Sequence, residues 1–216
     1  MKPSFRCIAA VPALLLAACA STTGSQYFSL VDSHAQLSAT HEATGKPIAI
    51  HLQPVELPAQ IDRPQIVLST AGSDALMLLN ESVWAAPLSN EIRQAMSLSL
   101  ADQLDAISID SMRAPQGLKV WSIGFTVNRF EMRNGEEAAL EATWKLTAPS
   151  AKGSVQLCRA MATQPVTENG VAPLVEAQKT LLQRFSRAIA ANIHGASVPQ
   201  ESGLQNLRCS TTSASR

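Results

Sequence analysis

The sequence lacks several features that would place the protein in a common functional class. It carries 17 basic and 17 acidic residues without any basic run, so nucleic acid is not an expected partner. No hydrophobic stretch reaches the roughly 20 residues that a transmembrane helix needs. The signatures of phosphate-binding loops, nucleophilic serine elbows, zinc proteases, Cys-x-x-Cys redox pairs and dinucleotide sites are also absent. We therefore expect neither a metal nor a cofactor, and no catalytic residue.

Histidine is scarce, with four residues scattered along the chain. His51 falls on a predicted strand, where a solvent-facing side chain is favoured over a ligand or base. Glu136 and Glu137 follow a predicted turn and are better explained as solvated than as an acid–base pair. A hydrolase that uses a serine with His51 or His194 is therefore the least favoured functional hypothesis.

The N-terminal segment has the layout of an export signal. Residues 1–18 combine Lys2 and Arg6 with a short apolar run and small residues before a cleavage site, which is typical of a signal peptide. Loss of this segment leaves the chain slightly acidic and long enough to bury the core of one domain.

Cys19 directly follows the signal in the sequence Leu16-Ala17-Ala18-Cys19, which matches the bacterial lipobox. In such proteins diacylglycerol alkylates the cysteine thiol and the chain is cut before it. We expect Cys19 to be lipidated and residues 19–26 to be a short linker, with an ordinary secretory signal as the alternative. Several acyl chains anchor a protein nearly permanently. Ala20 stands where Asp would retain the protein in the inner membrane, so the outer membrane is expected, with the domain facing the periplasm.

Two cysteines, Cys158 and Cys209, lie in the remaining chain. An oxidising compartment favours a disulfide between them, and two unpaired thiols are the alternative because sequence does not give the geometry. The Ser/Thr-rich residues 197–216 are predicted to be a flexible tail.

The periodicity of apolar residues predicts one α/β domain over residues 27–196. Alternation predicts strands at 48–52, 65–69, 76–79, 118–132, 140–146 and 155–161, and helical spacing predicts helices at 87–104 and 170–194. A phase slip near Phe130 indicates a β-bulge, and Asn134-Gly135 predicts a two-residue hairpin turn. This order is typical of an α+β sandwich, with two helices packed on a mostly antiparallel or mixed sheet.

Two apolar features allow more than one interpretation. Trp84 precedes the first predicted helix and is favoured as a core residue, with partner contact as the alternative. Residues 76–79 form either a buried strand or an exposed edge suited to assembly.

Several segments, in order and spacing, resemble the ABC-type transport auxiliary lipoproteins (the PqiC-like family). These are the lipobox, Tyr27-Phe28-Ser29-Leu30, Pro54–Pro58 followed by Ile61–Val67, and Trp84–Leu88. Arg63, Pro64, Trp84 and Pro87 are the motif residues, with structural or interface roles. Ala86 replaces the acidic residue usual in the family, which leaves the role of that charge open here.

The resemblance implies a non-enzymatic outer-membrane lipoprotein of an envelope lipid-transport system. The chain would dock a periplasmic MCE-domain protein and support membrane integrity, and it would be able to form a homo-oligomeric ring. A lipoprotein regulator that binds a cell-wall synthase is the second hypothesis.

Overall fold

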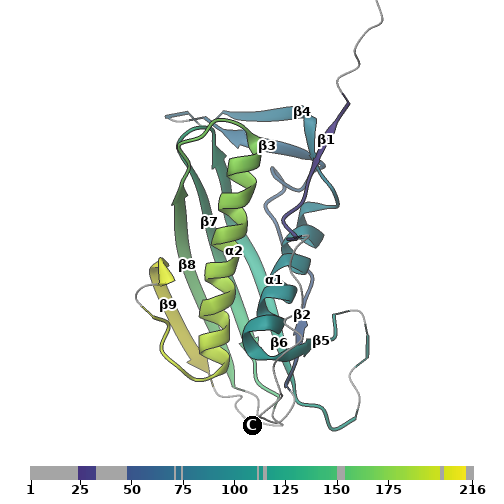
Figure 1. Cartoon of the computed structure of the whole chain (residues 1–216). Coiled ribbons are helices and arrows are strands. Elements are labelled where there is room, and N and C mark those ends of the chain that lie inside the picture. Colours follow the sequence, from purple (N-terminus) through teal and green to yellow (C-terminus); the bar gives the residue numbers. More distant parts are fainter. Residues whose placement is uncertain are drawn as a thin grey trace, which may run out of the picture.

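The computed structural model describes residues 24–32, 48–70, 72–73, 75–110, 112–113, 116–149, 154–199 and 202–212. Two helices lie side by side over one face of a six-stranded sheet, and a three-stranded sheet lies at one end (Figure 1). This arrangement confirms the predicted single α+β domain with two helices packed on sheets. The predicted signal peptide over residues 1–18, Cys19 and residues 33–47 lie outside the described residues.

The large sheet has the strand order β5-β2-β6-β7-β8-β9. β2 runs parallel to β5 and β6, whereas the pairs from β6 to β9 are antiparallel, so the sheet is mixed. The bounds of these strands are β2 Ile48–Leu52, β5 Ala106–Ser108, β6 Val120–Arg133, β7 Glu137–Thr147, β8 Val155–Pro165 and β9 Gln205–Thr212. The small sheet has the order β1-β4-β3, with β1 Gln26–Phe28, β3 Gln65–Ser69 and β4 Leu76–Trp84.

The hairpin of β6 and β7 contains the predicted bulge, because its register shifts between Val127 and Arg129. Its turn is longer than predicted. Arg133 pairs with Glu137, which leaves three residues in the loop, and Gly135 adopts a φ of 71°. The Glu136 carbonyl accepts the N–H of Val166 at 2.8 Å. This bond continues the pairing of β7 with β8 beyond Glu137 and Pro165. The two-residue turn was therefore wrong by one residue.

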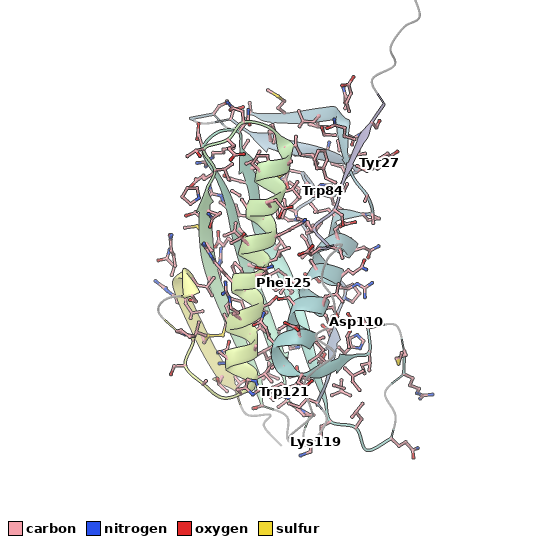
Figure 2. All side chains as sticks on the ribbon, viewed as in Figure 1. Tyr27, Trp84, Asp110, Lys119, Trp121 and Phe125 are labelled. Carbon is pink, nitrogen blue, oxygen red and sulfur yellow. A yellow bond between two sulfur atoms is a disulfide. The ribbon has the colours of Figure 1, made fainter. Side chains whose placement is uncertain are left out.

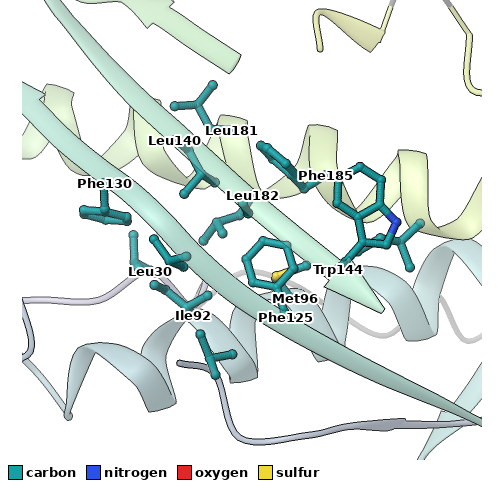
Figure 3. Close-up of a cluster of buried hydrophobic side chains, with 14 of the residues drawn as sticks. Leu30, Ile92, Met96, Phe125, Phe130, Leu140, Trp144, Leu181, Leu182 and Phe185 are labelled. Carbon is teal, nitrogen blue, oxygen red and sulfur yellow. The ribbon is translucent and has the colours of Figure 1, made fainter. Parts of the chain in front are cut away.

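The helices α1 Leu88–Leu104 and α2 Val171–Ile193 provide one side of the core. Phe185 of α2 packs edge-to-face against Phe125 and Trp144 of the sheet, with both ring-centroid distances at 5.8 Å (Figure 3). Ile92 and Met96 of α1 are fully buried. Burying each such side chain stabilises the fold by about 1.5–3 kcal/mol, so this cluster holds the two layers together.

The C-terminal segment is a strand, and the prediction of a flexible tail over residues 197–216 was wrong for residues 205–212. Strand β9 pairs antiparallel with β8, where Cys158 lies opposite Cys209. A disulfide joins these two cysteines, whose Cα atoms are 4.1 Å apart. The polar sequence of β9 is ordered by tertiary pairing and this cross-link.

Candidate functional site

The family-motif segments meet in the small sheet. The Trp84 N–H donates to the Pro64 carbonyl at 2.8 Å, and the Ala85 N–H donates to the Phe28 carbonyl at 2.8 Å. Three segments that are far apart in sequence are therefore joined by main-chain hydrogen bonds at one end of the molecule. Figure 2 shows Tyr27 and Trp84 at this end and Lys119 and Trp121 at the other.

Trp84 belongs to the core. Its side chain is 4% exposed and packs edge-to-face on Phe130, with the ring centroids 6.2 Å apart. Pro87 is the N-cap of α1, and its carbonyl accepts the N–H groups of Asn90 and Glu91. Both residues therefore set the path of the chain into α1, and Trp84 is too buried to contact a partner.

Arg63 ends a tight turn that begins at Pro58. The Ile61 N–H donates to the Pro58 carbonyl at 3.1 Å, and the Arg63 N–H donates to the Ile61 carbonyl at 2.9 Å. Arg63 is half-buried, and its Nε atom is buried without a hydrogen-bond acceptor in the described part of the chain. Two residues before Pro58, the main chain of Glu56 bonds to β6 through Phe125 and Val127, just before the bulge.

Glu91 is a buried carboxylate that the sequence reasoning missed. It is 4% exposed, and its Oε2 accepts the Ser29 hydroxyl at 2.6 Å and the Leu30 N–H at 2.9 Å. Burial of a carboxylate is costly unless it is hydrogen-bonded in this way. Glu91 therefore fastens the segment after β1 to α1. The available signal was its place between the apolar residues Leu88 and Ile92.

The outer face of the large sheet carries a network of ion pairs. Glu131 accepts from Arg129 at 2.7 Å and from Arg133 at 2.9 Å, and Arg133 also pairs with Glu137. The hydrogen bond from Arg129 and the nearby positive charges hold the pKa of the Glu131 carboxyl below its usual value, against the opposing effect of burial. The same contact raises the pKa of Arg129. This face is polar and charged.

The structure distributes the remaining candidate residues over separate elements. His51 is half-buried on β2, and His194 is exposed at the C-cap of α2. Glu136 is exposed in the turn, while Glu137 is ion-paired with Arg133. Within the described ranges, no three His, Cys, Asp or Glu side chains gather closely enough to hold a metal ion.

Exposed apolar side chains occur at both ends of the molecule. Leu76, Met77 and Leu78 of β4 are exposed, which decides the interpretation that the sequence left open in favour of an exposed segment. Tyr27 of β1 is also exposed at this end (Figure 2). Ile107 is exposed on β5, which lies toward the other end (Figure 1). Met112 is also exposed, and its N–H donates to the carbonyl of Ile109, just after β5. None of the helices in the described part of the chain is long and apolar enough to cross a membrane.

Two solved structures have a fold similar to that of this chain. One solved structure, described as an uncharacterized protein, matches with a TM-score of 0.61 and 16% identity over 79% of this chain and 99% of its own. Protein XCC0632 from Xanthomonas campestris, described under the family model DUF330, matches with a TM-score of 0.52 and 15% identity over 68% of this chain and 84% of its own. At these identities the likeness concerns the fold. No curated protein matches.

The fold is thus that of a small α+β domain whose motif residues organise structure. The model of the ABC-type transport auxiliary lipoprotein component family matches residues 28–190. The chain belongs to this family, which confirms the resemblance seen in the sequence.

Proposed function

We propose that the protein is a non-enzymatic lipoprotein subunit of an envelope lipid-transport system. In this proposal Cys19 carries the acyl anchor, the outer membrane holds it, and the domain docks a periplasmic MCE-domain protein. The observation that carries the proposal is the family match over residues 28–190, together with the lipobox that ends at Cys19.

The arrangement of the domain supports a docking role. β1, the first strand of the described chain, lies at the end that carries the small sheet (Figure 1). A chain tethered there directs its other end away from the membrane. Ile107 and Met112, which are 57% and 62% exposed, offer an apolar contact for a partner at that distant end.

Co-purification from native membranes tests this function. The tagged full chain, extracted in mild detergent from its own bacterium, is expected to recover an MCE-domain protein. Replacing Ile107 and Met112 by Asp should lower that recovery, because charge on an apolar contact opposes burial. Leu157→Asp is the matched control, since Leu157 is 51% exposed on β8.

Two results would contradict the proposal. One is the absence of any MCE-domain protein from the extract. The other is recovery of a cell-wall synthase in its place, which would support the regulator hypothesis.

A further inference from the structure

We propose that the tip of the β3–β4 hairpin inserts into the lipid surface beside the acyl anchor. The hairpin tip is defined as Leu76, Met77 and Leu78. The inference rests on the proposed lipidation of Cys19 and adds a second membrane contact made by the folded domain itself.

The hairpin tip is apolar on both faces. Leu76, Met77 and Leu78 are 45%, 55% and 42% exposed. Successive side chains of a strand point to opposite faces, so these three residues present apolar groups in both directions. A protein partner usually covers one face of a strand, whereas lipid surrounds an inserted segment. The two-sided exposure therefore favours lipid.

Charge is nearly absent from the hairpin. Residues 65–84, which make up the hairpin, contain two charged side chains, those of Asp74 and Glu81, and both are acidic. Attraction to anionic headgroups therefore contributes little, and insertion would be driven by the burial of apolar surface. The contact should accordingly resist salt.

The strand pairing sets the depth of the contact. β3 pairs with Leu76–Leu79 along one edge of β4, while β1 pairs only with residues 82–84 on the other edge. Along Leu76–Leu79, no strand of the described residues covers that second edge. Open edges are not tolerated in the hydrocarbon interior, so the hairpin tip would lie at the level of the headgroups, where water still reaches the main chain.

The first strand of the described chain, β1, and the hairpin tip lie at the same end of the molecule. Cys19 precedes the first residue of β1, Gln26, by seven residues, a length of chain that spans at most about 25 Å. β1 pairs directly with β4, and both lie at one end in Figure 1. Tyr27 is 71% exposed on β1, and tyrosine favours membrane interfaces, where its ring is buried and its hydroxyl is wet.

Two contacts would fix the orientation of the domain. An acyl chain alone lets a tethered domain rotate about its linker. A hairpin tip held at the headgroups would turn the β5 end, with Ile107 and Met112, toward the periplasm. The inference thus explains how the docking surface would be presented.

A fluorescent label on the acylated protein tests the inference. The chain with Met77→Cys is labelled with a dye whose emission moves to shorter wavelength in apolar surroundings, and is reconstituted in phosphatidylethanolamine–phosphatidylcholine vesicles. In the mature acylated chain the new thiol is the free one, since Cys19 is alkylated and Cys158 and Cys209 are bonded. Met112→Cys is the matched control, because Met112 is similarly exposed at the other end.

We expect the label at position 77 to shift to shorter wavelength and to be quenched by nitroxide-bearing lipids, with neither change at position 112. Adding Leu76→Glu and Leu78→Glu should abolish both effects. An unshifted label at position 77 in acylated protein would overturn the inference, and so would a shift without lipid quenching, which would indicate a protein neighbour. The mass of the intact chain reports acylation separately. An unacylated chain would contradict the proposed anchor, whereas an acylated chain with a water-exposed label contradicts only the insertion.

Discussion

Glu91 shows how a single residue connects the start of the domain to its body. Its carboxylate holds the Ser29 hydroxyl and the Leu30 N–H within the protein, and Leu30 itself is 2% exposed. In the proposed tethered protein, force on the anchor would reach the domain through this segment. The contact therefore stabilises the join between the segment after β1 and α1.

Replacing Glu91 by Ala should lower the free energy of unfolding by about 1–3 kcal/mol, because the Leu30 N–H would be left buried without an acceptor. Glu91→Gln, which keeps one oxygen acceptor, should cost less. Urea denaturation measures both. Glu176→Ala serves as the control, since Glu176 is 67% exposed in its pair with Lys179 and such pairs contribute little. Equal losses for Glu91→Ala and Glu176→Ala would contradict this role.

Glu131 should make stability depend on pH in the acidic range. The pKa of its carboxyl is lowered in the folded protein from 4.5, mainly by the hydrogen bond from Arg129. A carboxyl with a lowered folded-state pKa stabilises the fold above its unfolded value, and this stability is lost as pH falls through the folded value. The stability difference between the wild type and Glu131→Gln should therefore be largest near neutral pH and shrink below 4.5. Urea titrations across this range measure it, and a difference that grows toward acid would be the opposite of the expected sign.

At the scale of elements, alternation and helical spacing in the sequence were sufficient for most of the fold. α2 and the long β6 strand follow clear apolar periods, because each buries one face against the core, and the bulge is visible as a slip in the period of β6. β9 has no such period. Its order comes from pairing with β8 and from the disulfide, which are tertiary contacts that local sequence does not encode.

The same limit applies to the candidate site. Trp84 was favoured as a core residue, with partner contact as the alternative, and its burial confirms the core. The burial of Glu91 depends on the packing of the segment after β1 against α1, and that segment lies about 60 positions earlier in the chain. The exposure of Leu76–Leu78 depends on which strands flank β4. The sequence therefore singled out Trp84 and residues 76–79 without deciding which of them face solvent, and Glu91 was missed.

The disulfide should hold β9 on the sheet. Replacing both Cys158 and Cys209 by Ala removes a cross-link between residues 51 positions apart, and loss of such a cross-link typically costs about 2–4 kcal/mol. Hydrogen exchange should then accelerate in residues 205–212 while the amides of β6 and β7 remain protected, because β9 is the edge strand. Unchanged protection of β9 would show that pairing alone retains it.

The whole molecule is polarised along its length and across its sheet. One end combines the start of β1 with the apolar hairpin tip, and the other carries Ile107 and Met112. Across the sheet, the helices cover one face and ion pairs populate the other. Such a shape suits a tethered adaptor with one end for the membrane and one for a partner.

In the proposed function the membrane-anchored chain captures a periplasmic MCE-domain protein. Vesicle flotation tests it most directly, with purified MCE-domain protein added to vesicles that carry the acylated chain, to bare vesicles, and to vesicles that carry the chain with Ile107→Asp and Met112→Asp. We expect the MCE-domain protein to float with the first set, to be absent from the bare vesicles and to be depleted with the variant. Equal recovery with bare vesicles, or none with the acylated chain, would contradict it.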